Sequence, residues 1–98
     1  MGEDSAAAAR LLRELREHKG RSLRAAAEDL GVAASHLSRW ERGERSPSPE
    51  LRERAARYYG VDDATISLNM GLVPSDIVRI LRENPEVLAE LRRRYPAT

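Results

Sequence analysis

Apolar residues recur every three or four positions along most of this 98-residue chain. In residues 5–18, the apolar positions Ala8, Leu11, Leu12 and Leu15 follow the period of a helix, and a glycine comes soon afterwards. No stretch alternates between apolar and polar residues with a period of two, as a half-buried strand would. The pattern therefore predicts an all-α fold class.

Four more helices are predicted before residue 70, because each has a capping residue or a glycine at its ends. They are expected over residues 23–30, 33–42, 49–59 and 63–69. The expected N-caps are Ser22, Ser48 and Asp62, and the expected stops are Gly31, Gly43 and Gly60. Pro49 fits the first position of its helix because that position needs no intrahelical N–H.

The segment MGLVP, residues 70–74, interrupts the helical pattern. Beyond it, residues 75–83 are expected to form one helix, and Asn84 and Pro85 are expected to cap and open another. We therefore divide the chain into a first domain over residues 5–69 and a C-terminal helical hairpin over residues 74–95. The hairpin carries six large apolar residues, Ile77, Ile80, Leu81, Val87, Leu88 and Leu91. This cluster either mediates dimerisation or packs back on its own domain.

The predicted helix over residues 33–42 has two unlike faces. Ala33, Leu37 and Trp40 fall within about 60° of one another around the helix axis. The opposite side carries Ser35, Ser38, Arg39 and Arg42. Short hydroxyl side chains with flanking arginines allow close approach to a ligand surface, and such a face suits the edge of the DNA major groove.

The preceding helix has the features that a steep helix crossing needs. A small residue is required where two helices cross, and the turn needs a residue that adopts positive φ readily. Ala27 and Gly31 meet these needs, and Leu37 and Trp40 are placed to fill the wedge between the two helices.

Over residues 11–61 the chain resembles the Cro and phage-repressor type of helix-turn-helix protein, also called the XRE family. The resemblance is carried by LRELREHKG, SLRAAAEDLGV, SRWERGERSPS and AARYYGV, in this order and spacing. It implies a compact five-helix domain in which helix 33–42 enters the major groove and helix 23–30 lies across the DNA backbone.

The resemblance also implies roles for individual residues. Base-reading positions fall at Ala34, Ser35, Ser38 and Arg39, with His36 near the rim. Arg39 either contacts guanine or is a phosphate contact or a solvated charge, and the two serines touch either bases or phosphates. Backbone contacts are expected from Arg21, Ser22, Arg24, Arg42 and Arg45. Arg16 and Glu41 match a structural ion pair that joins the first and third helices of the family.

Two positions depart from the family pattern. Leu23 stands where many members have a glutamine that donates to a phosphate. Either Arg21 or Arg24 replaces that contact, or Leu23 joins the core. Ala33 replaces the usual Ser or Thr cap of the third helix, at an expected cost on the order of 1 kcal/mol.

Charge and composition add little specificity. Residues 1–60 hold 12 Lys and Arg against 10 Asp and Glu, a balance of +2, whereas residues 61–98 hold 5 against 6, a balance of −1. Lys19 is the one lysine among 17 cationic residues. Guanidinium groups suit phosphates and guanine edges, but a GC-rich genome also favours arginine codons.

The same composition argues against several classes of protein. There is no cysteine, and His18 and His36 lack partners at ligand spacing, so we expect no metal and no cofactor. No nucleotide-binding glycine loop or paired nucleophile and base is recognisable, so we expect no enzyme. No apolar run is long enough to span a bilayer, and the acidic start is unlike a secretory signal, so we expect a cytoplasmic protein.

The sequence thus predicts a sequence-specific regulator of transcription that binds double-stranded DNA, of a kind found in bacteria and phages and most often a repressor in this family. A homodimer is expected, because one such domain buries only a modest surface on DNA. The alternative is an antitoxin or another protein-binding module, in which the C-terminal hairpin contacts a partner protein.

Overall fold

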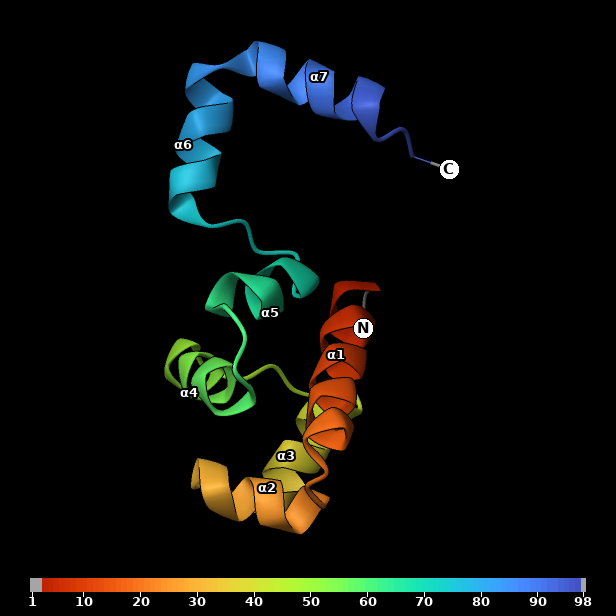
Figure 1. The fold of residues 1–98 in the computed structure, drawn as a ribbon, viewed down its shortest axis with the longest axis vertical. Coiled ribbons are helices and arrows are strands. Elements are labelled where there is room, and N and C mark those ends of the chain that lie inside the picture. The colour runs from red at the N-terminus through yellow and green to blue at the C-terminus, as the bar shows by residue number, and fades with distance from the viewer. Residues whose placement is uncertain (1–2, 98) are drawn as a thin grey trace.

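The computed structural model describes residues 3–97, and this part of the chain consists of seven α-helices without a strand (Figure 1). The all-α expectation is therefore confirmed. The helices are α1 (Glu3–Lys19), α2 (Leu23–Leu30), α3 (Ala34–Glu41), α4 (Pro49–Tyr59), α5 (Asp63–Asn69), α6 (Ser75–Glu83) and α7 (Pro85–Arg94).

The ends of the short helices follow from local capping chemistry. The Ser22 hydroxyl accepts a hydrogen bond from the Ala25 N–H at the start of α2, and the Ser48 hydroxyl accepts one from the Leu51 N–H at the start of α4. At the start of α5, the Asp62 carboxylate accepts from the Ala64 N–H. Each cap satisfies an N–H that has no partner within its helix, and the three predicted N-caps are confirmed.

Asn84 stands at the N-cap of α7 and Pro85 opens the helix, as predicted. The Asn84 side chain makes no capping hydrogen bond to α7. Its amide group donates instead to the Ile80 carbonyl of the preceding helix, at 2.9 Å. The backbone N–H of Asn84 donates to the same carbonyl, so this residue closes α6 and leaves the first turn of α7 uncapped.

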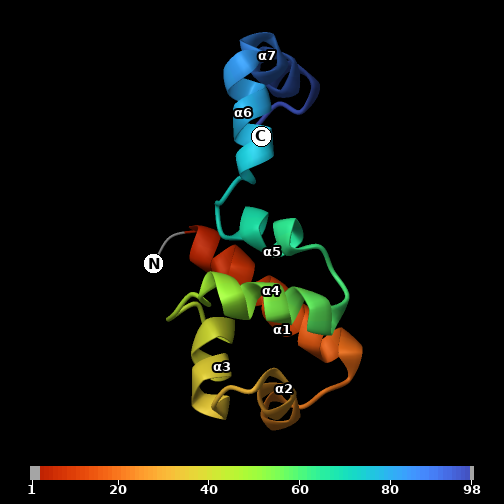
Figure 2. The same cartoon turned by 90° about the vertical axis from the view of Figure 1, so that its left-hand side faces the viewer.

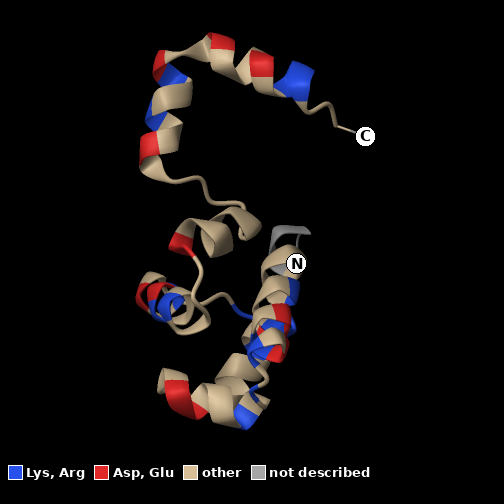
Figure 3. Cartoon of the chain, viewed as in Figure 1, with Lys and Arg blue, Asp and Glu red and all other residues tan. Residues whose placement is uncertain are grey.

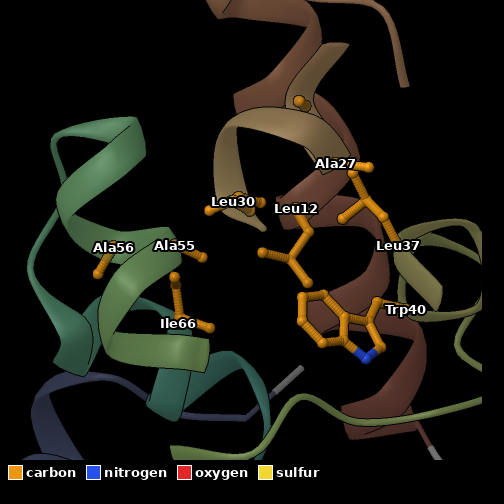
Figure 4. Packing of buried hydrophobic residues seen from close by; sticks show 9 residues of the cluster. Leu12, Ala27, Leu30, Leu37, Trp40, Ala55, Ala56 and Ile66 are labelled. Carbon is orange, nitrogen blue, oxygen red and sulfur yellow. The ribbon is translucent and has the colours of Figure 1, made fainter. Parts of the chain in front are cut away.

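Helices α1 to α5 pack around one core of small and medium-sized apolar side chains. Figure 4 shows Leu12 of α1 facing Leu30, Leu37 and Trp40, with Ala55, Ala56 and Ile66 on the side of α4 and α5. Leu30, Leu37, Trp40 and Ile66 are each at most 2% exposed. The alanines let the helix backbones approach closely, because a methyl group occupies little space between them.

The chain is elongated because α6 and α7 project from this five-helix body (Figures 1 and 2). In both views α2 and α3 lie at one end of the molecule, and α6 and α7 lie at the other. Helix α6 makes its main contacts with another helix at α7. The hairpin expected at the C-terminus is an open pair, in which α7 leaves α6 at a corner.

The apolar residues of this C-terminal pair are not covered by the five-helix body. No described residue of α6 or α7 is buried. Ile77, Ile80, Leu88 and Leu91 are 41%, 46%, 39% and 43% exposed, and only Leu81 and Val87, near the corner, are half-buried. The alternative that this cluster packs back on its own domain is therefore not what the structure shows.

Candidate nucleic-acid interface

Helices α2 and α3 are joined by a short turn that depends on Gly31. This residue has φ 74° and ψ 32°, a left-handed conformation that side chains with a Cβ disfavour. The turn is closed by the Val32 N–H, which donates to the Ala27 carbonyl at 2.9 Å. Arg54 of α4 donates to the Leu30 carbonyl at 2.9 Å, which satisfies another group at the end of α2. The turn therefore has a fixed geometry that sets the direction of α3.

The inner face of α3 holds the helix against the body. Leu37 and Trp40 are 1% and 2% exposed, as the apolar pattern predicts. Ala34 is half-buried and also packs against the core. Ala33 was placed on this face by its helical spacing, and that placement is wrong, because Ala33 is exposed. It has an extended backbone with ψ 144°, so it precedes the helix and the helical spacing does not apply to it.

The outer face of α3 carries the exposed polar residues. Ser35 and Arg39 are exposed, and Ser38 is half-buried. His36 is also half-buried, because its ring packs edge-on against the Trp40 ring with the ring centroids 5.0 Å apart. Of the five residues predicted to read bases, Ser35 and Arg39 are thus the most accessible, whereas Ala34 and His36 have part of their surface covered by the protein.

An ion pair fixes the far end of α3 to α1. Arg16 donates from Nε and Nη2 to the two carboxylate oxygens of Glu41, at 2.8 and 3.0 Å. The hydrogen bond with Glu41 raises the pKa of Arg16. Both side chains are mostly covered, which keeps the carboxylate of Glu41 out of the exposed face of α3.

The residues expected to contact the DNA backbone differ in how free they are. Arg24 and Arg45 are exposed, whereas the hydroxyl of Ser22 is engaged in capping α2. Arg42 pairs with Glu44 at 2.8 Å on the surface. Arg21 donates to Asp29 at 2.7 and 3.0 Å, so a carboxylate balances its charge.

Asp29 joins α2 to α4 as well as binding Arg21. The Tyr58 hydroxyl of α4 donates to the same carboxylate oxygen. This hydrogen bond, together with those from Arg21, lowers the pKa of Asp29. Lys19 lies over the Tyr58 ring, 4.7 Å from its centroid. The cluster links the start and end of α2 to α4 and accounts for the orientation of Arg21.

The arrangement of α2 and α3 is that of a helix-turn-helix, and a comparison of the sequence with known families agrees. Residues 7–68, more than half of the chain, match the family described as helix-turn-helix domain. The chain belongs to the helix-turn-helix domain family. Helix-turn-helix domains bind DNA, which is consistent with the resemblance to the Cro and phage-repressor type. No curated protein and no solved structure matches the chain.

The helix-turn-helix domain contains one cationic residue near the candidate interface that the sequence analysis did not single out. Arg13 of α1 lines a shallow depression of about 200 Å³ together with Ser38 and Arg42. Arg13 lies three positions before Arg16, so the two residues share one side of α1. This spacing was visible in the sequence, but the position of α3 beside this side of α1 was not.

Two departures from the family pattern also have a structural outcome in this helix-turn-helix. Leu23 is half-buried and packs against the core, as one of the alternatives for that position expects. Ala33 makes no side-chain hydrogen bond to the first turn of α3. The N-terminus of α3 therefore keeps unpaired N–H groups close to its exposed face.

Among the described side chains of residues 6–97, no group of three or more His, Cys, Asp or Glu residues is placed to hold a metal ion. Among the helices of the same residues, none combines the length and the apolar character needed to cross a bilayer.

Proposed function

We propose that this protein is a sequence-specific regulator of transcription, and specifically a repressor, that inserts α3 into the major groove of double-stranded DNA. The observation that carries the proposal is the division of α3 into a buried face with Leu37 and Trp40 and an outer face with Ser35 and Arg39 exposed. Burial of the inner face fixes the helix, so the outer polar side chains are presented without a large loss of order on binding.

In this proposal the outer residues of α3 have separate roles. Arg39 donates two hydrogen bonds to guanine O6 and N7, a contact worth roughly 1–3 kcal/mol of discrimination between bases. Ser35 and Ser38 contact base edges or phosphates at close range, and Ala34 and His36 line the rim of the contact. The methyl group of Ala34 offers an apolar surface of the kind that contacts the methyl group of thymine.

The DNA backbone is held by cationic residues on both sides of α3. Arg24 and Arg45 are exposed and bind phosphates directly, and Arg13 joins Arg42 at the depression between α1 and α3. At the start of α2, Arg21 and Ser22 make further contacts with the DNA backbone, and Asp29 partly balances the charge of Arg21. These contacts position the domain and carry no sequence information.

Two copies are proposed to act together, because a single small domain buries a modest area on DNA and dimers bind half-sites about one helical turn apart. The exposed apolar residues of α6 and α7 supply the contact between copies. The same exposed residues favour a second candidate function, in which they bind a partner protein, as in an antitoxin. Co-purification of a stoichiometric partner that covers α6 and α7 would favour this second function.

The proposal is tested by selecting bound duplexes from a random pool and comparing Arg39→Ala with Arg42→Ala. The wild-type protein is expected to enrich one motif. Arg39→Ala is expected to relax the choice of base at one position, whereas Arg42→Ala weakens all duplexes alike and flattens the dependence of affinity on salt. An unenriched pool for the wild-type protein would overturn sequence-specific binding. Uniform losses from both variants would make Arg39 a phosphate contact.

A further inference from the structure

Helix α7 has an apolar stripe that no other described helix covers. Val87, Leu88 and Leu91 recur at helical spacing and therefore share one side of the helix, and Tyr95 follows directly after its last residue, Arg94. Leu88 and Leu91 are 39% and 43% exposed, and Tyr95 is 70% exposed. Along the chain, Leu91 lies between Val87 and Leu88 before it and Tyr95 after it. A contiguous stripe of this kind is typical of a surface that another helix covers.

The order of charges along α7 indicates which helix that is. Glu86 and Glu90 lie in the first part of α7, and Arg92, Arg93 and Arg94 form its last turn, as the red and blue segments of Figure 3 show. No ion pair among the described residues involves these groups. The three adjacent arginines repel a second basic end and attract an acidic one. Helix dipoles add to this preference for opposite directions.

We propose that α7 pairs with α7 of a second copy of this chain in antiparallel orientation, with the two Leu91 side chains meeting at the two-fold axis. In this register Tyr95 of one copy lies level with Val87 of the other and within one residue of its Leu88. Glu90 and Arg94 lie on the same flank of the stripe, four positions apart. The antiparallel arrangement therefore brings Glu90 of one copy beside Arg94 of the other, twice per dimer.

This inference deepens the proposed function, since it specifies how the two copies proposed to bind DNA together are joined. Its test does not use DNA, so the two proposals fail separately. The amphipathic α6 adds to the same interface, because Ile77 and Ile80 are exposed on the helix that leads to α7. The interface lies at the opposite end of the molecule from α3, and so leaves the outer face of α3 accessible in both copies.

The oligomeric state of the full chain is measured first, by size-exclusion chromatography with light scattering. We expect a mass of twice the 11.0 kDa of one chain. Leu91→Glu is expected to give a monomer, because it puts two carboxylates at the two-fold axis. Ala89→Glu is the matched control, since Ala89 is exposed about 160° around the helix from Leu91, and it is expected to stay dimeric. A monomeric wild-type protein would overturn the inference, and so would a dimer unaffected by Leu91→Glu.

The orientation is measured by disulfide cross-linking, which is unambiguous because the chain has no cysteine of its own. Chains carrying Leu88→Cys and chains carrying Tyr95→Cys are oxidised separately and as a mixture. In the proposed register the two positions lie within about 1.5 Å of each other along the axis, whereas identical positions are separated by about 9 Å (Leu88) and about 12 Å (Tyr95). We expect covalent dimers in the mixture and few or none in either single variant.

The outcomes of the cross-linking experiment separate the possible arrangements. Efficient self-linking of each single variant would mean parallel helices and would overturn the proposal. Absence of cross-links from a protein that dimerises would place the interface elsewhere and would also overturn it. A cross-linked dimer that fails to bind any duplex would leave the inference standing and count against the proposed function instead.

Discussion

Arg16 and Glu41 form an ion pair with two hydrogen bonds that connects α1 to α3 across 25 positions of the sequence. Arg16 also donates from Nη1 to the Arg21 carbonyl at 3.0 Å. Its guanidinium therefore connects α1 both to the loop before α2 and to α3. The side chains of Arg16 and Glu41 are only 15% and 6% exposed. Loss of either partner would therefore leave the other charge with little access to water.

Replacing Arg16 with methionine is expected to lower the free energy of unfolding by about 3 kcal/mol, because Glu41 then remains as an uncompensated charge in a mostly covered position. Urea denaturation followed by circular dichroism measures the change. Arg13→Met is the matched control, since its pair with Glu17 is more than half exposed on both sides. The control should change stability by less than about 1 kcal/mol. Equal small losses in both variants would contradict the role assigned to the pair.

Replacing Ala33 with serine is expected to stabilise the protein by about 1 kcal/mol, because the new hydroxyl can accept a hydrogen bond from an unpaired N–H in the first turn of α3. Ser22→Ala should have the opposite effect, since it removes the bond from the Ala25 N–H. Thermal and chemical denaturation measure both. Ala89→Ser serves as the control, in which the same substitution is made inside an exposed helix with no cap to complete. A stabilisation no greater than that of this control would refute the capping explanation.

Tyr59 is expected to make the protein less stable at high pH. Burial raises the pKa of Tyr59 to about 12, and its hydroxyl has no hydrogen-bond partner among the described residues. Tyrosine in the unfolded chain has a pKa near 10. Below about pH 10 both states keep the proton, and this contribution to stability is complete. Between about pH 10 and 12 only the folded state keeps it, so the stability falls as the pH rises.

The contribution of Tyr59 is isolated by Tyr59→Phe, which should be at least as stable as the wild-type protein at neutral pH because it removes a buried hydroxyl without a partner. Its stability should also fall less steeply between about pH 10 and 12. Parallel profiles for wild type and Tyr59→Phe would contradict the prediction.

Removing the carboxylate of Glu44 is expected to strengthen binding to any duplex. Glu44 pairs with Arg42 at 2.8 Å, so the guanidinium must exchange this carboxylate for a phosphate when the protein binds DNA, and Glu44→Ala removes that competition. Affinity measured at a fixed salt concentration should therefore rise for duplexes of any sequence. Glu53→Ala removes the same charge at an exposed position of α4 and controls for net charge. If both variants bind alike, the pairing with Arg42 has no bearing on DNA affinity.

The fold was predictable to the extent that it is determined locally. Ser22, Ser48 and Asp62 cap helices through hydrogen bonds to N–H groups two or three residues away, so these helix starts are visible in the sequence. The burial of Leu37 and Trp40 followed from helical spacing for the same reason. Ala33 was misplaced because helical spacing was applied one residue before the start of α3, where the backbone is still extended.

The candidate site was less predictable where contacts join distant segments. Arg21 donates to Asp29, and the same carboxylate accepts a hydrogen bond from Tyr58. Tyr58 belongs to α4 and reaches Asp29 only after the body has folded. Arg13 borders the same depression as Ser38 because α1 passes beside α3, a relationship that no local pattern contains. The apolar side of α6 and α7 was visible in the sequence, but helical spacing gives the direction of a stripe and not the identity of what covers it.

The sole tryptophan of the chain is Trp40, which is 2% exposed on the inner face of α3 with its indole N–H lacking a hydrogen-bond partner among the described residues. Its fluorescence therefore arises from one apolar environment directly beneath the proposed reading surface. Emission that stays blue when a duplex is added would report rigid docking of α3, and a red shift would report that the helix lifts from the body. The protein thus carries an intrinsic fluorescent probe that reports whether α3 moves relative to the body when a duplex is added.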